Sequence, residues 1–532
     1  MPASIIGRMT SPLALLRRPA GIALSTLVAS LALSACGGGG GSAGTSAGAG
    51  SSGTAPTTPT TPTTPTTPTT PVVTAPDPIP ADFTSYQNLC AAPRTGVDAS
   101  GLAFPDRQGT LLDEMKFLRG WADRYYLWYS EIPSSVRMAD YTTAIGYFGA
   151  LKTPGLTASG KAKDRFHFTY TTAEWDALNT AGEEVGYGLT WSRNATTPPR
   201  TWLAAIVEPD SPAAKAGVQR GDMLVAVDGV DFVETGTTAG VAKLNAGLFP
   251  EAAGEAHRLT IRRGASTFDV NLNAAVVASA SVKNAKVLDT ANGKVGYLTF
   301  DDFNAVAEKQ LIDAFAMFKA QGVTDLVIDM RYNGGGLLYI AAELAYMVTG
   351  PATAGKTFEQ LQYNDKTAPD APIPFRNSAY GFASPNPARA GQALPYLGLN
   401  RVTVLATSGT CSASEAVING LRGVDVQVDV IGGQTCGKPY GFTPVDNCGT
   451  TYFSIEFQGV NAKGFGDFAD GFAPTCAVSD DLSRAQGDPA EGMLAAALNY
   501  RASGTCPVSR AKAVNMELVR PQAKEIAILP RK

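Results

Sequence analysis

Histidine is scarce in this chain, which contains only two among its 532 residues, His167 and His257. His167 lies between two phenylalanines, and His257 precedes Arg258 at the expected start of a strand. Neither belongs to a recognisable nucleophile motif, so the histidine base of most serine hydrolases is not evident. A hydrolytic site here would need another base, and lysine is the first residue to consider.

Runs of basic residues are also missing. Lysine and arginine total 43 against 47 aspartates and glutamates, which gives a net charge of −4 without any basic cluster. The electrostatic footprint of a nucleic-acid-binding protein is therefore absent, and we expect no nucleic-acid partner. With 44% hydrophobic and 17% charged residues, the chain can build real cores. Its length predicts about two to four domains.

Pairs of cysteines with the spacing typical of metal sites are also absent. No two cysteines are separated by two residues, so we expect neither a zinc site nor another metal, and we predict no cofactor. Six of the seven cysteines follow the N-terminal segment, and they are Cys90, Cys411, Cys436, Cys448, Cys476 and Cys506. In an exported protein they could form up to three disulfides, whose pairing the sequence does not fix.

The N-terminus has the order of an export signal. Three arginines precede an apolar run over 20–33, which is too short and too rich in small residues for a strong membrane-spanning helix. The sequence Leu-Ser-Ala then precedes Cys36 and resembles a bacterial lipobox. This resemblance implies a signal peptide over 1–35 and a lipid on Cys36, with Gly37 favouring the outer membrane facing the periplasm. The alternative is an ordinary secretory signal with an incidental cysteine.

Residues 36–83 are dominated by Gly, Ser and Ala and then by a Thr-Thr-Pro repeat. Such a composition cannot build a core, so it predicts a flexible piece followed by a stiffer proline-rich spacer. We therefore expect a disordered tether that holds the folded part away from a membrane.

Residues 84–182 are predicted to form a helical domain. Apolar and aromatic residues recur at helical spacing from Leu111 to Tyr129. Thr171 and Glu174 fit a capping box before a second, short helix. An aromatic stripe of this kind is more often core than binding surface, so we assign it no ligand.

Residues 185–277 change to short strands and turns. A strand is expected over 202–207, Ser211 fits the N-cap of a short helix, and Asp228-Gly229 is a hairpin signal. The run from Ser211 to Asp222 resembles the corresponding run of bacterial PDZ domains.

The PDZ resemblance implies a peptide-binding loop formed by Gly186, Tyr187, Gly188 and Leu189. Backbone amides of Gly188 and Leu189 would face a terminal carboxylate, and an adjacent strand edge would accept the peptide main chain.

Residues 285–510 alternate between strand and helix. Strands are expected over 295–300, 325–330, 401–407 and 427–431, with a helix over 305–319. Such alternation predicts an α/β layer structure with functional residues at strand ends. Residues 511–532 remain as a C-terminal tail.

Ser412 lies between the strand at 401–407 and a helix expected from Ser414. A hydroxyl at such a turn is exposed, and the backbone N–H of Ala413 lies at the positive end of the helix, where it can stabilise an oxyanion. A second donor is available in the Asn333-Gly334-Gly335-Gly336 run, since glycines let the backbone approach a substrate closely. Taken alone, this run fits a tight turn equally well.

Lys438 follows the strand at 427–431 and a short loop. If this strand is adjacent to that of Ser412, both residues lie at the same end of the sheet. A lysine base must lose its proton, so its pKa has to fall from about 10.4 toward 7 or 8 through burial. Pro439, Tyr440 and Phe442 supply apolar neighbours for this. Taken alone, Lys438 also fits a solvated loop lysine.

Together these motifs resemble the carboxyl-terminal processing (tail-specific) proteases of peptidase family S41. Ser412-Ala413-Ser414-Glu415 matches the family's nucleophile motif, Gly437-Lys438 its base motif, and 329–337 its glycine-rich segment. The resemblance implies Ser412 as nucleophile, Lys438 as general base, and the amides of Gly336 and Ala413 as oxyanion hole. It also implies a multidomain α/β fold with an N-terminal helical domain, a PDZ domain and a ClpP/crotonase-like catalytic core.

The chain departs from the family four residues after the base, where many relatives have a lysine-orienting glutamine and this chain has Phe442. Tyr440 and Glu415 are candidates to orient Lys438 instead. Cys411 and Cys436 flank both candidate catalytic residues and would brace the site if oxidised, with free thiols as the alternative.

We therefore expect a lipid-anchored serine endopeptidase of the bacterial envelope that cleaves unfolded or C-terminally exposed proteins through a Ser-Lys dyad. The PDZ domain would deliver substrate C-termini or gate the site, and an adaptor or activator protein is a further expected partner. Two alternatives use the same scaffold: a non-catalytic protein that binds ligands or peptides, and a PDZ adaptor that binds C-terminal peptides without turnover.

Overall fold

The computed structural model describes residues 76–98, 101–506 and 517–519, which belong to one compact unit beginning at Val73. The expected signal peptide, the lipidation site Cys36 and the first part of the tether lie outside the described residues. Within the described ranges, none of the helices has both the length and the apolar character needed to cross a bilayer.

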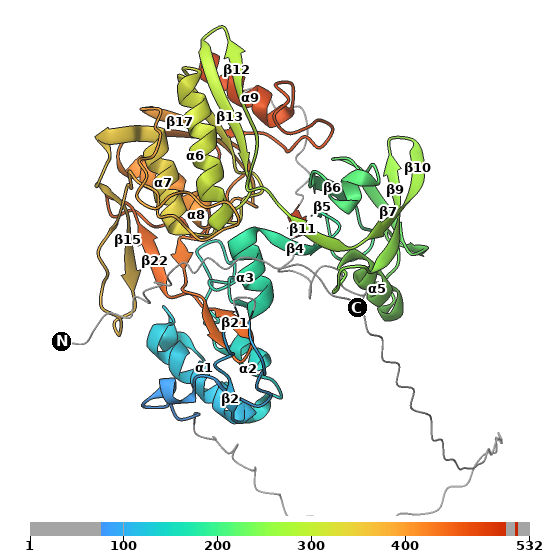
Figure 1. Cartoon of the computed structure of the whole chain (residues 1–532), viewed down its shortest axis with the longest axis vertical. Coiled ribbons are helices and arrows are strands. Elements are labelled where there is room, and N and C mark those ends of the chain that lie inside the picture. The colour runs from blue at the N-terminus through green and yellow to red at the C-terminus, as the bar shows by residue number, and fades with distance from the viewer. Residues whose placement is uncertain (1–75, 99–100, 507–516, 520–532) are drawn as a thin grey trace, which may run out of the picture. The chain divides into compact units, whose positions relative to one another are not determined.

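The N-terminal block, blue to cyan in Figure 1, is mainly helical. Its elements are η1 (Phe83–Tyr86), β1 (Leu89–Cys90), β2 (Arg107–Gln108), α1 (Leu111–Tyr125), η2 (Tyr129–Glu131), η3 (Met138–Asp140), α2 (Ala144–Ala150), β3 (Phe168–Thr171) and α3 (Thr172–Ala181). The capping box of Thr171 and Glu174 is confirmed at the start of α3. Helix α1 ends at Tyr125, before the predicted end at Tyr129, because Tyr126 is extended and the Leu127 N–H donates to the carbonyl of Ile455.

A late stretch of the chain completes this block. β3 pairs antiparallel with β21 (Thr450–Phe453), which also pairs with β20 (Val445–Asn447). A disulfide joins Cys90 to Cys448. Tyr452 and Ile455 are buried in the same apolar core as α1 and α2. The helical block therefore shares its core with residues more than 300 positions later.

The green part of Figure 1 follows as a β-rich block. It contains β4 (Glu183–Gly186), β5 (Leu189–Arg193), β6 (Trp202–Val207), α4 (Pro212–Lys215), β7 (Met223–Val227), β8 (Val230–Asp231), α5 (Thr238–Leu248), β9 (Ala256–Arg263), β10 (Ser266–Asn273) and β11 (Ala275–Ala278). The strand order of its main sheet is β10-β9-β7-β6-β5-β24, with β8 paired to β7, and the last strand, β24 (Glu517–Val519), comes from the C-terminal tail. β4 and β11 pair with each other at the two ends of the block.

The third block contains a six-stranded sheet in the order β12-β13-β14-β17-β18-β23. Its strands are β12 (Val282–Thr290), β13 (Gly293–Phe300), β14 (Asp325–Asp329), β17 (Arg401–Ala406), β18 (Gln427–Gly432) and β23 (Cys476–Ala477). All neighbouring strands are parallel except β12 and β13. A second sheet is formed by β15 (Thr357–Tyr363), β16 (Ile373–Pro374), β19 (Tyr440–Gly441) and β22 (Phe457–Val460).

The helices of the third block are α6 (Ala305–Ala320), α7 (Leu338–Thr349), η4 (Gly350–Ala352), α8 (Ala413–Gly423) and α9 (Gly492–Ser503). Alternate residues of the parallel strands pack into two separate apolar cores. Leu326 and Ile328 of β14 pack with α6, α7 and α8, whereas Val327 between them packs with Met493 and Leu494 of α9. Because successive side chains of a strand point to opposite faces, helices cover both faces of the sheet.

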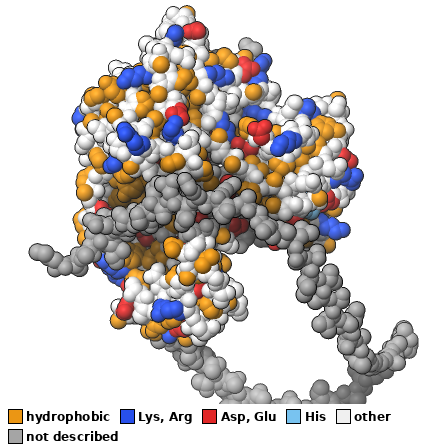
Figure 2. Space-filling model, viewed as in Figure 1, with side chains coloured by type: hydrophobic (Ala, Val, Ile, Leu, Met, Phe, Trp, Pro, Cys, Tyr) orange, Lys and Arg blue, Asp and Glu red, His pale blue; other side chains and the backbone are white. Residues whose placement is uncertain are grey.

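The predicted secondary structure of this block is confirmed. The strands expected over 295–300, 325–330, 401–407 and 427–431 are β13, β14, β17 and β18, and the helix expected over 305–319 is α6. Runs of buried apolar residues made them recognisable, since a strand covered on both faces is apolar throughout. Charges of both signs are interspersed on the face drawn in Figure 2, as expected from a composition with nearly equal numbers of each.

Candidate active site

Ser412 lies at the turn between β17 and α8, as the sequence predicted. Its backbone has φ 55° and ψ −116°, a conformation that is rarely adopted by a residue with a side chain. Such a conformation costs on the order of 1–3 kcal/mol and persists only where the surroundings fix it. The nucleophile turn (residues 407–412) must therefore be held by specific contacts.

Asn333 supplies several of these contacts from the glycine loop (residues 333–336). Its carbonyl accepts the N–H of Cys411 at 3.0 Å and the hydroxyl of Ser414 at 3.1 Å. Its side-chain oxygen accepts the N–H of Gly335 at 2.8 Å, and its amide group donates to the carbonyl of Phe300 at 3.0 Å. One buried asparagine thus binds both the nucleophile turn and the glycine loop.

The two glycines at the end of this loop leave no room for a side chain. Gly335 and Gly336 have φ 102° and 133°. A Cβ on Gly335 would lie 2.7 Å from Cβ of Ser412 and 2.9 Å from N of Ala413, and one on Gly336 would lie 2.7 Å from the carbonyl oxygen of Phe303. The glycine loop therefore runs directly against the nucleophile turn, and Gly336 is exposed beside it.

Glu415 joins the nucleophile turn to the lysine loop (residues 433–438). Its buried carboxylate accepts backbone N–H groups of Ser412 at 3.1 Å, Gly437 at 2.9 Å and Lys438 at 2.8 Å, and the hydroxyl of Thr435 at 2.6 Å. Burial raises the pKa of the Glu415 carboxyl, while these four donors act in the opposite direction. Glu415 therefore fixes the backbone on which Lys438 is placed.

Lys438 lies on the loop that follows β18, and β18 is the parallel neighbour of β17. The two candidate residues therefore come from the same end of adjacent strands, as predicted. Lys438 is buried, with 8% of its surface exposed. Its Nζ lies 4.1 Å from the ring centre of Phe442 and 5.1 Å from that of Phe166. The position where many relatives have glutamine thus offers an aromatic face to the lysine nitrogen.

Two contacts to the lysine loop come from the N-terminal block and could not be found from the sequence. Nη2 of Arg165 donates to the carbonyls of Cys436 at 2.7 Å, Gly437 at 3.1 Å and Ala469 at 3.2 Å. Phe166 contributes one of the two rings near Lys438. Their partners lie about 270 residues later, and no spacing within the local sequence indicates such a contact.

A disulfide between Cys411 and Cys436 joins the nucleophile turn to the lysine loop. The pairing of Cys476 with Cys506 completes the set of three, which the sequence left open. Within the described ranges, Cys411, Glu415 and Cys436 also lie close enough together to hold a metal ion. Because both sulfurs are bound to each other, they offer no thiolate ligand in this state.

Beneath the glycine loop, Arg331 is fully buried among three carboxylates. It forms ion pairs with Asp329 at 2.8 Å, Asp480 at 2.6 Å and Glu491 at 2.8 Å. Burial alone would lower the pKa of Arg331, but the carboxylates hold it well above the usual value. This cluster supports the end of β14, from which the glycine loop starts.

Arg220 of the β-rich block reaches the same cluster. Its guanidinium donates to the hydroxyl of Tyr332 at 2.7 Å, to Asp480 at 2.7 Å and to the carbonyl of Ala205 at 2.6 Å. Tyr332 directly precedes Asn333, and its hydroxyl also donates to Asp480. Arg220 was part of the PDZ-like sequence run, which gave no sign of this contact.

The predicted peptide-binding residues lie where β5 begins. Gly186 ends β4 and Leu189 opens β5. The buried Tyr187 hydroxyl donates to the carbonyl of Gly247 at 3.0 Å. Gly188 has φ 72°, and a Cβ there would lie 2.3 Å from Cβ of Ser211. These four residues therefore sit together at the end of the strand that borders β24.

Both histidines have other partners. His167 is packed 3.8 Å from Phe148 in the N-terminal block, and its Nε2 is bonded to the carbonyl of Phe148 at 2.9 Å. His257 is bonded to Asp228 at 2.6 Å in the β-rich block. Lysine therefore remains the candidate base.

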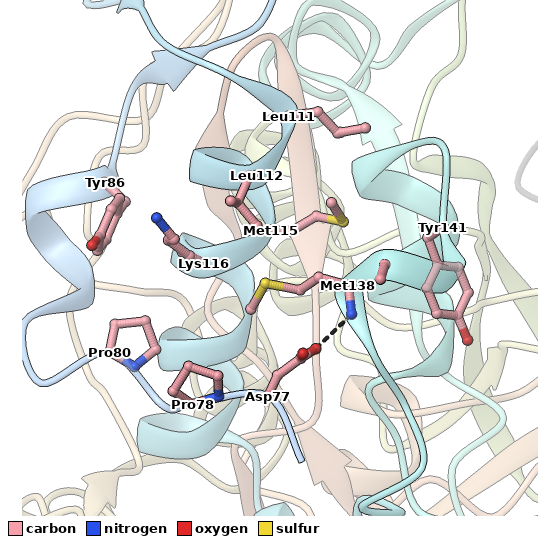
Figure 3. A pocket seen from close by; sticks show the side chains of 11 residues that line it. Asp77, Pro78, Pro80, Tyr86, Leu111, Leu112, Met115, Lys116, Met138 and Tyr141 are labelled. Atoms are coloured by element: carbon pink, nitrogen blue, oxygen red, sulfur yellow. Dashed lines mark hydrogen bonds between the residues drawn. The ribbon is translucent and has the colours of Figure 1, made fainter. Parts of the chain in front are cut away.

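A cavity of about 720 Å³ lies beside α1, lined mainly by apolar side chains such as Leu112, Met115 and Met138 (Figure 3). Asp77 also lines it and accepts the N–H of Met138 at 2.5 Å (Figure 3). Neither Ser412 nor Lys438 lines this cavity. Its size alone therefore does not mark it as the catalytic site.

Two regions of the chain match known family models. Residues 294–461 match peptidase family S41, and residues 205–263 match the PDZ domain. The first range includes the glycine loop, Ser412 and Lys438, and the second includes Arg220.

Two curated relatives are carboxyl-terminal-processing proteases. The chain is 29% identical over 206 residues to the one from Picosynechococcus sp., covering 37% of this chain and 47% of the relative. It is 25% identical over 268 residues to the one from Synechocystis sp., covering 49% and 54%. The chain thus spans about half the length of the curated relatives it matches.

A crystal structure assigned to an S41 protease from Bacteroides fragilis has the same fold, with a TM-score of 0.56 at 24% identity. The match covers 73% of this chain and 97% of that chain. The predicted multidomain α/β class is therefore confirmed, and so is the presence of both domain types. The chain thus contains a region similar to peptidase family S41, preceded by a region similar to the PDZ domain.

Proposed function

We propose that the protein is a serine endopeptidase in which Ser412 is the nucleophile and Lys438 the general base. The observation that supports this most directly is the position of Glu415, which accepts backbone N–H groups from both candidate residues. Asn333 adds the glycine loop to the same assembly. The glycine loop, the nucleophile turn and the lysine loop thus follow three neighbouring parallel strands, β14, β17 and β18.

In the proposed reaction, neutral Lys438 takes the proton of the Ser412 hydroxyl as its oxygen attacks the scissile carbonyl. The N–H groups of Gly336 and Ala413 stabilise the oxyanion, and Ala413 lies at the positive end of α8. Protonated Lys438 then gives its proton to the leaving amine, which breaks the peptide bond and leaves an acyl-serine. Lys438 next accepts a proton from water, whose oxygen attacks the ester carbonyl. The bond between the acyl carbon and Ser412 Oγ then breaks, Lys438 returns the proton to that oxygen, and the acid product leaves.

Lys438 must be neutral to act as the base in this mechanism. Lys438 is buried, with 8% of its surface exposed, and lies beside the rings of Phe442 and Phe166. The cleavage rate should therefore rise with pH as Lys438 loses its proton. A flat rate profile between about pH 6 and 9 would argue against lysine as the base.

We further propose that the substrates are unfolded or C-terminally exposed proteins, recognised through the PDZ domain. PDZ domains bind extended peptides at a strand edge, and the curated relatives are named carboxyl-terminal-processing proteases. The contacts from Arg220 to Tyr332 and Asp480 favour gating over simple delivery, because movement of the PDZ domain would disturb the residue that precedes the glycine loop.

The proposed location is the bacterial envelope, with a lipid on Cys36 holding the protein on the outer membrane. Three disulfides agree with an oxidising compartment. Mass spectrometry of the N-terminal peptide tests this directly. A diacylglyceryl-cysteine at Cys36 is expected, and an unmodified Cys36 in the mature protein would refute the anchor.

The test of function is cleavage of an unfolded protein by the purified chain, compared with Ser412→Ala and Lys438→Ala. Both variants should lose at least about a thousandfold in rate while keeping the wild-type circular dichroism spectrum. Matched controls are Ser408→Ala, an exposed serine of the same turn, and Lys356→Ala, an exposed lysine. Retained cleavage in Lys438→Ala, or no cleavage by the folded wild type, would contradict the proposal.

A further inference from the structure

The C-terminal tail contributes a strand to the edge of the PDZ sheet. β24 pairs antiparallel with β5, with Glu517 opposite Arg193, Leu518 opposite Ser192 and Val519 opposite Trp191. Its direction therefore leads toward the start of β5, where the predicted peptide-binding residues lie. Nothing in the sequence distinguished this strand from the rest of the tail.

Strand addition beside β5 is how an extended peptide would bind this domain. A peptide that enters a PDZ domain adds an antiparallel strand to a sheet edge, where main-chain hydrogen bonds supply affinity and side-chain pockets supply specificity. In the strand order of this sheet, β5 is next to the edge, and β24 holds the edge position itself. The tail thus occupies the place of such a peptide.

The side chains of β24 point to opposite sides, as expected for a strand. Val519 is 4% exposed and belongs to the PDZ core, together with Trp191 of β5 and Val241 and Leu244 of α5. Leu518 is partly buried and approaches the peptidase domain, since a Cβ on Gly409 would lie 3.1 Å from its Cδ1. Gly409 is part of the nucleophile turn, so the same short strand touches both domains.

We propose that the segment Glu517–Val519 is a built-in ligand of the PDZ groove, which competes with incoming peptides and restrains the domain beside the nucleophile turn. A peptide that replaces it needs an apolar side chain at the position of Val519. An acidic residue two positions earlier would pair with Arg193 as Glu517 does, at 3.4 Å. The segment acts as an intramolecular inhibitor that substrate or an activating peptide displaces.

Tethering makes this competition effective although the strand is short. A ligand carried on the same chain competes at an effective concentration on the order of millimolar, so a free peptide must exceed it or bind more tightly. Three paired residues with one deeply buried side chain form a contact small enough to be replaced by a longer peptide. Removal of the tail should therefore raise the apparent affinity of the groove for an added peptide.

The test uses a fluorescein-labelled peptide with the sequence of residues 514–521, measured by fluorescence anisotropy. The forms compared are the full-length chain, a chain ending at Arg510 that retains Cys506, full-length Val519→Asp, and the control Val97→Asp. Val97 is 58% exposed and lies in the N-terminal block, so it offers the same chemical change outside the groove. All forms carry Ser412→Ala, so that the probe is not cleaved.

The shortened chain and Val519→Asp should bind the probe at least tenfold more tightly than the full-length chain and Val97→Asp. Equal affinity in all four forms, or no binding by the shortened chain, would overturn the proposal. A labelled peptide with aspartate at the position of Val519 should bind none of the forms with comparable affinity. Equal binding of that peptide would show that the Val519 pocket is not used, which also overturns it.

This proposal goes beyond the proposed protease function, and the two can fail separately. Probe binding is measured without Ser412 chemistry, so an inactive protein in which the tail still masks the groove would refute only the protease. Conversely, a protein that cleaves unfolded substrates but binds the probe equally with and without its tail would refute only the tail as ligand. With Ser412 restored, the shortened chain should also cleave several-fold faster than the full-length chain at a limiting substrate concentration.

Discussion

The nucleophile turn and the PDZ groove are both held by contacts from other segments of the chain, but in different ways. The turn is fixed by Asn333, by Glu415 and by the Cys411–Cys436 disulfide. The groove is filled by three residues of β24, with Val519 as the single deeply buried side chain. A reacting group needs one fixed geometry, whereas a binding surface needs an occupant that can leave.

The largest expected effect comes from removing the buried cation Arg331, which supports the strand that precedes the glycine loop. Arg331→Met leaves Asp329, Asp480 and Glu491 without their shared partner in a buried cluster. We expect a loss of about 3–5 kcal/mol in the free energy of unfolding, measured by urea denaturation. Arg484→Met is the control, because that exposed arginine forms an ion pair with the partly exposed Asp488 at 3.4 Å. A loss below about 1 kcal/mol for Arg331→Met would show that the cluster is not needed.

The next effect concerns Glu415, which binds both loops of the candidate active site. Glu415→Gln keeps the size of the side chain but places an N–H donor where two backbone N–H groups now donate. A small misplacement of reacting groups costs on the order of a hundredfold, so kcat should fall by about this factor with little change in KM. Binding of the tail peptide should stay unchanged. Glu251→Gln, at an exposed position, is the control. A KM effect without a kcat effect would contradict the positioning role.

The third prediction concerns the pH dependence of stability caused by Glu343 in the peptidase domain. Burial, together with neighbouring Glu308, raises the pKa of Glu343 on α7 to about 9. The folded protein therefore keeps a proton that the unfolded chain has lost, and stability falls as pH rises from about 4.5 to 9. Glu343→Gln should remove this dependence and stabilise the protein at pH 8 by on the order of 1–3 kcal/mol. Parallel stability curves for variant and wild type between pH 5 and 8 would contradict this.

The smallest expected effect concerns β24, the strand that we propose can be displaced from the PDZ groove. Glu517 is 70% exposed on its side chain and pairs with Arg193 at 3.4 Å. Exposed ion pairs contribute little to binding energy. Glu517→Ala in the full-length chain should therefore change its affinity for the labelled tail peptide by no more than about twofold. A tenfold change would mean that this ion pair, and not Val519, holds the strand in place.

The central part of the candidate site could be predicted because its signals are local. Buried parallel strands give continuous apolar runs, and adjacent parallel strands bring Ser412 and Lys438 to the same end of the sheet. Arg165, Phe166 and β24 could not be predicted in this way. Their partners lie about 270 to 330 residues away, and a three-residue strand has no periodicity to recognise. The role of Phe442 also needed the structure, since a departure from a family motif does not reveal its replacement.

The pairing of β3 with β21 has a consequence for the order of events during synthesis. A growing chain makes the N-terminal block first, but that block lacks β21 and the partner of Cys90 until residues near 450 exist. Until the same stage, Arg165 has no lysine-loop carbonyls to bind. The candidate active site therefore assembles only after residues near 450 have been made, and we expect the proposed protease activity to appear only from that stage.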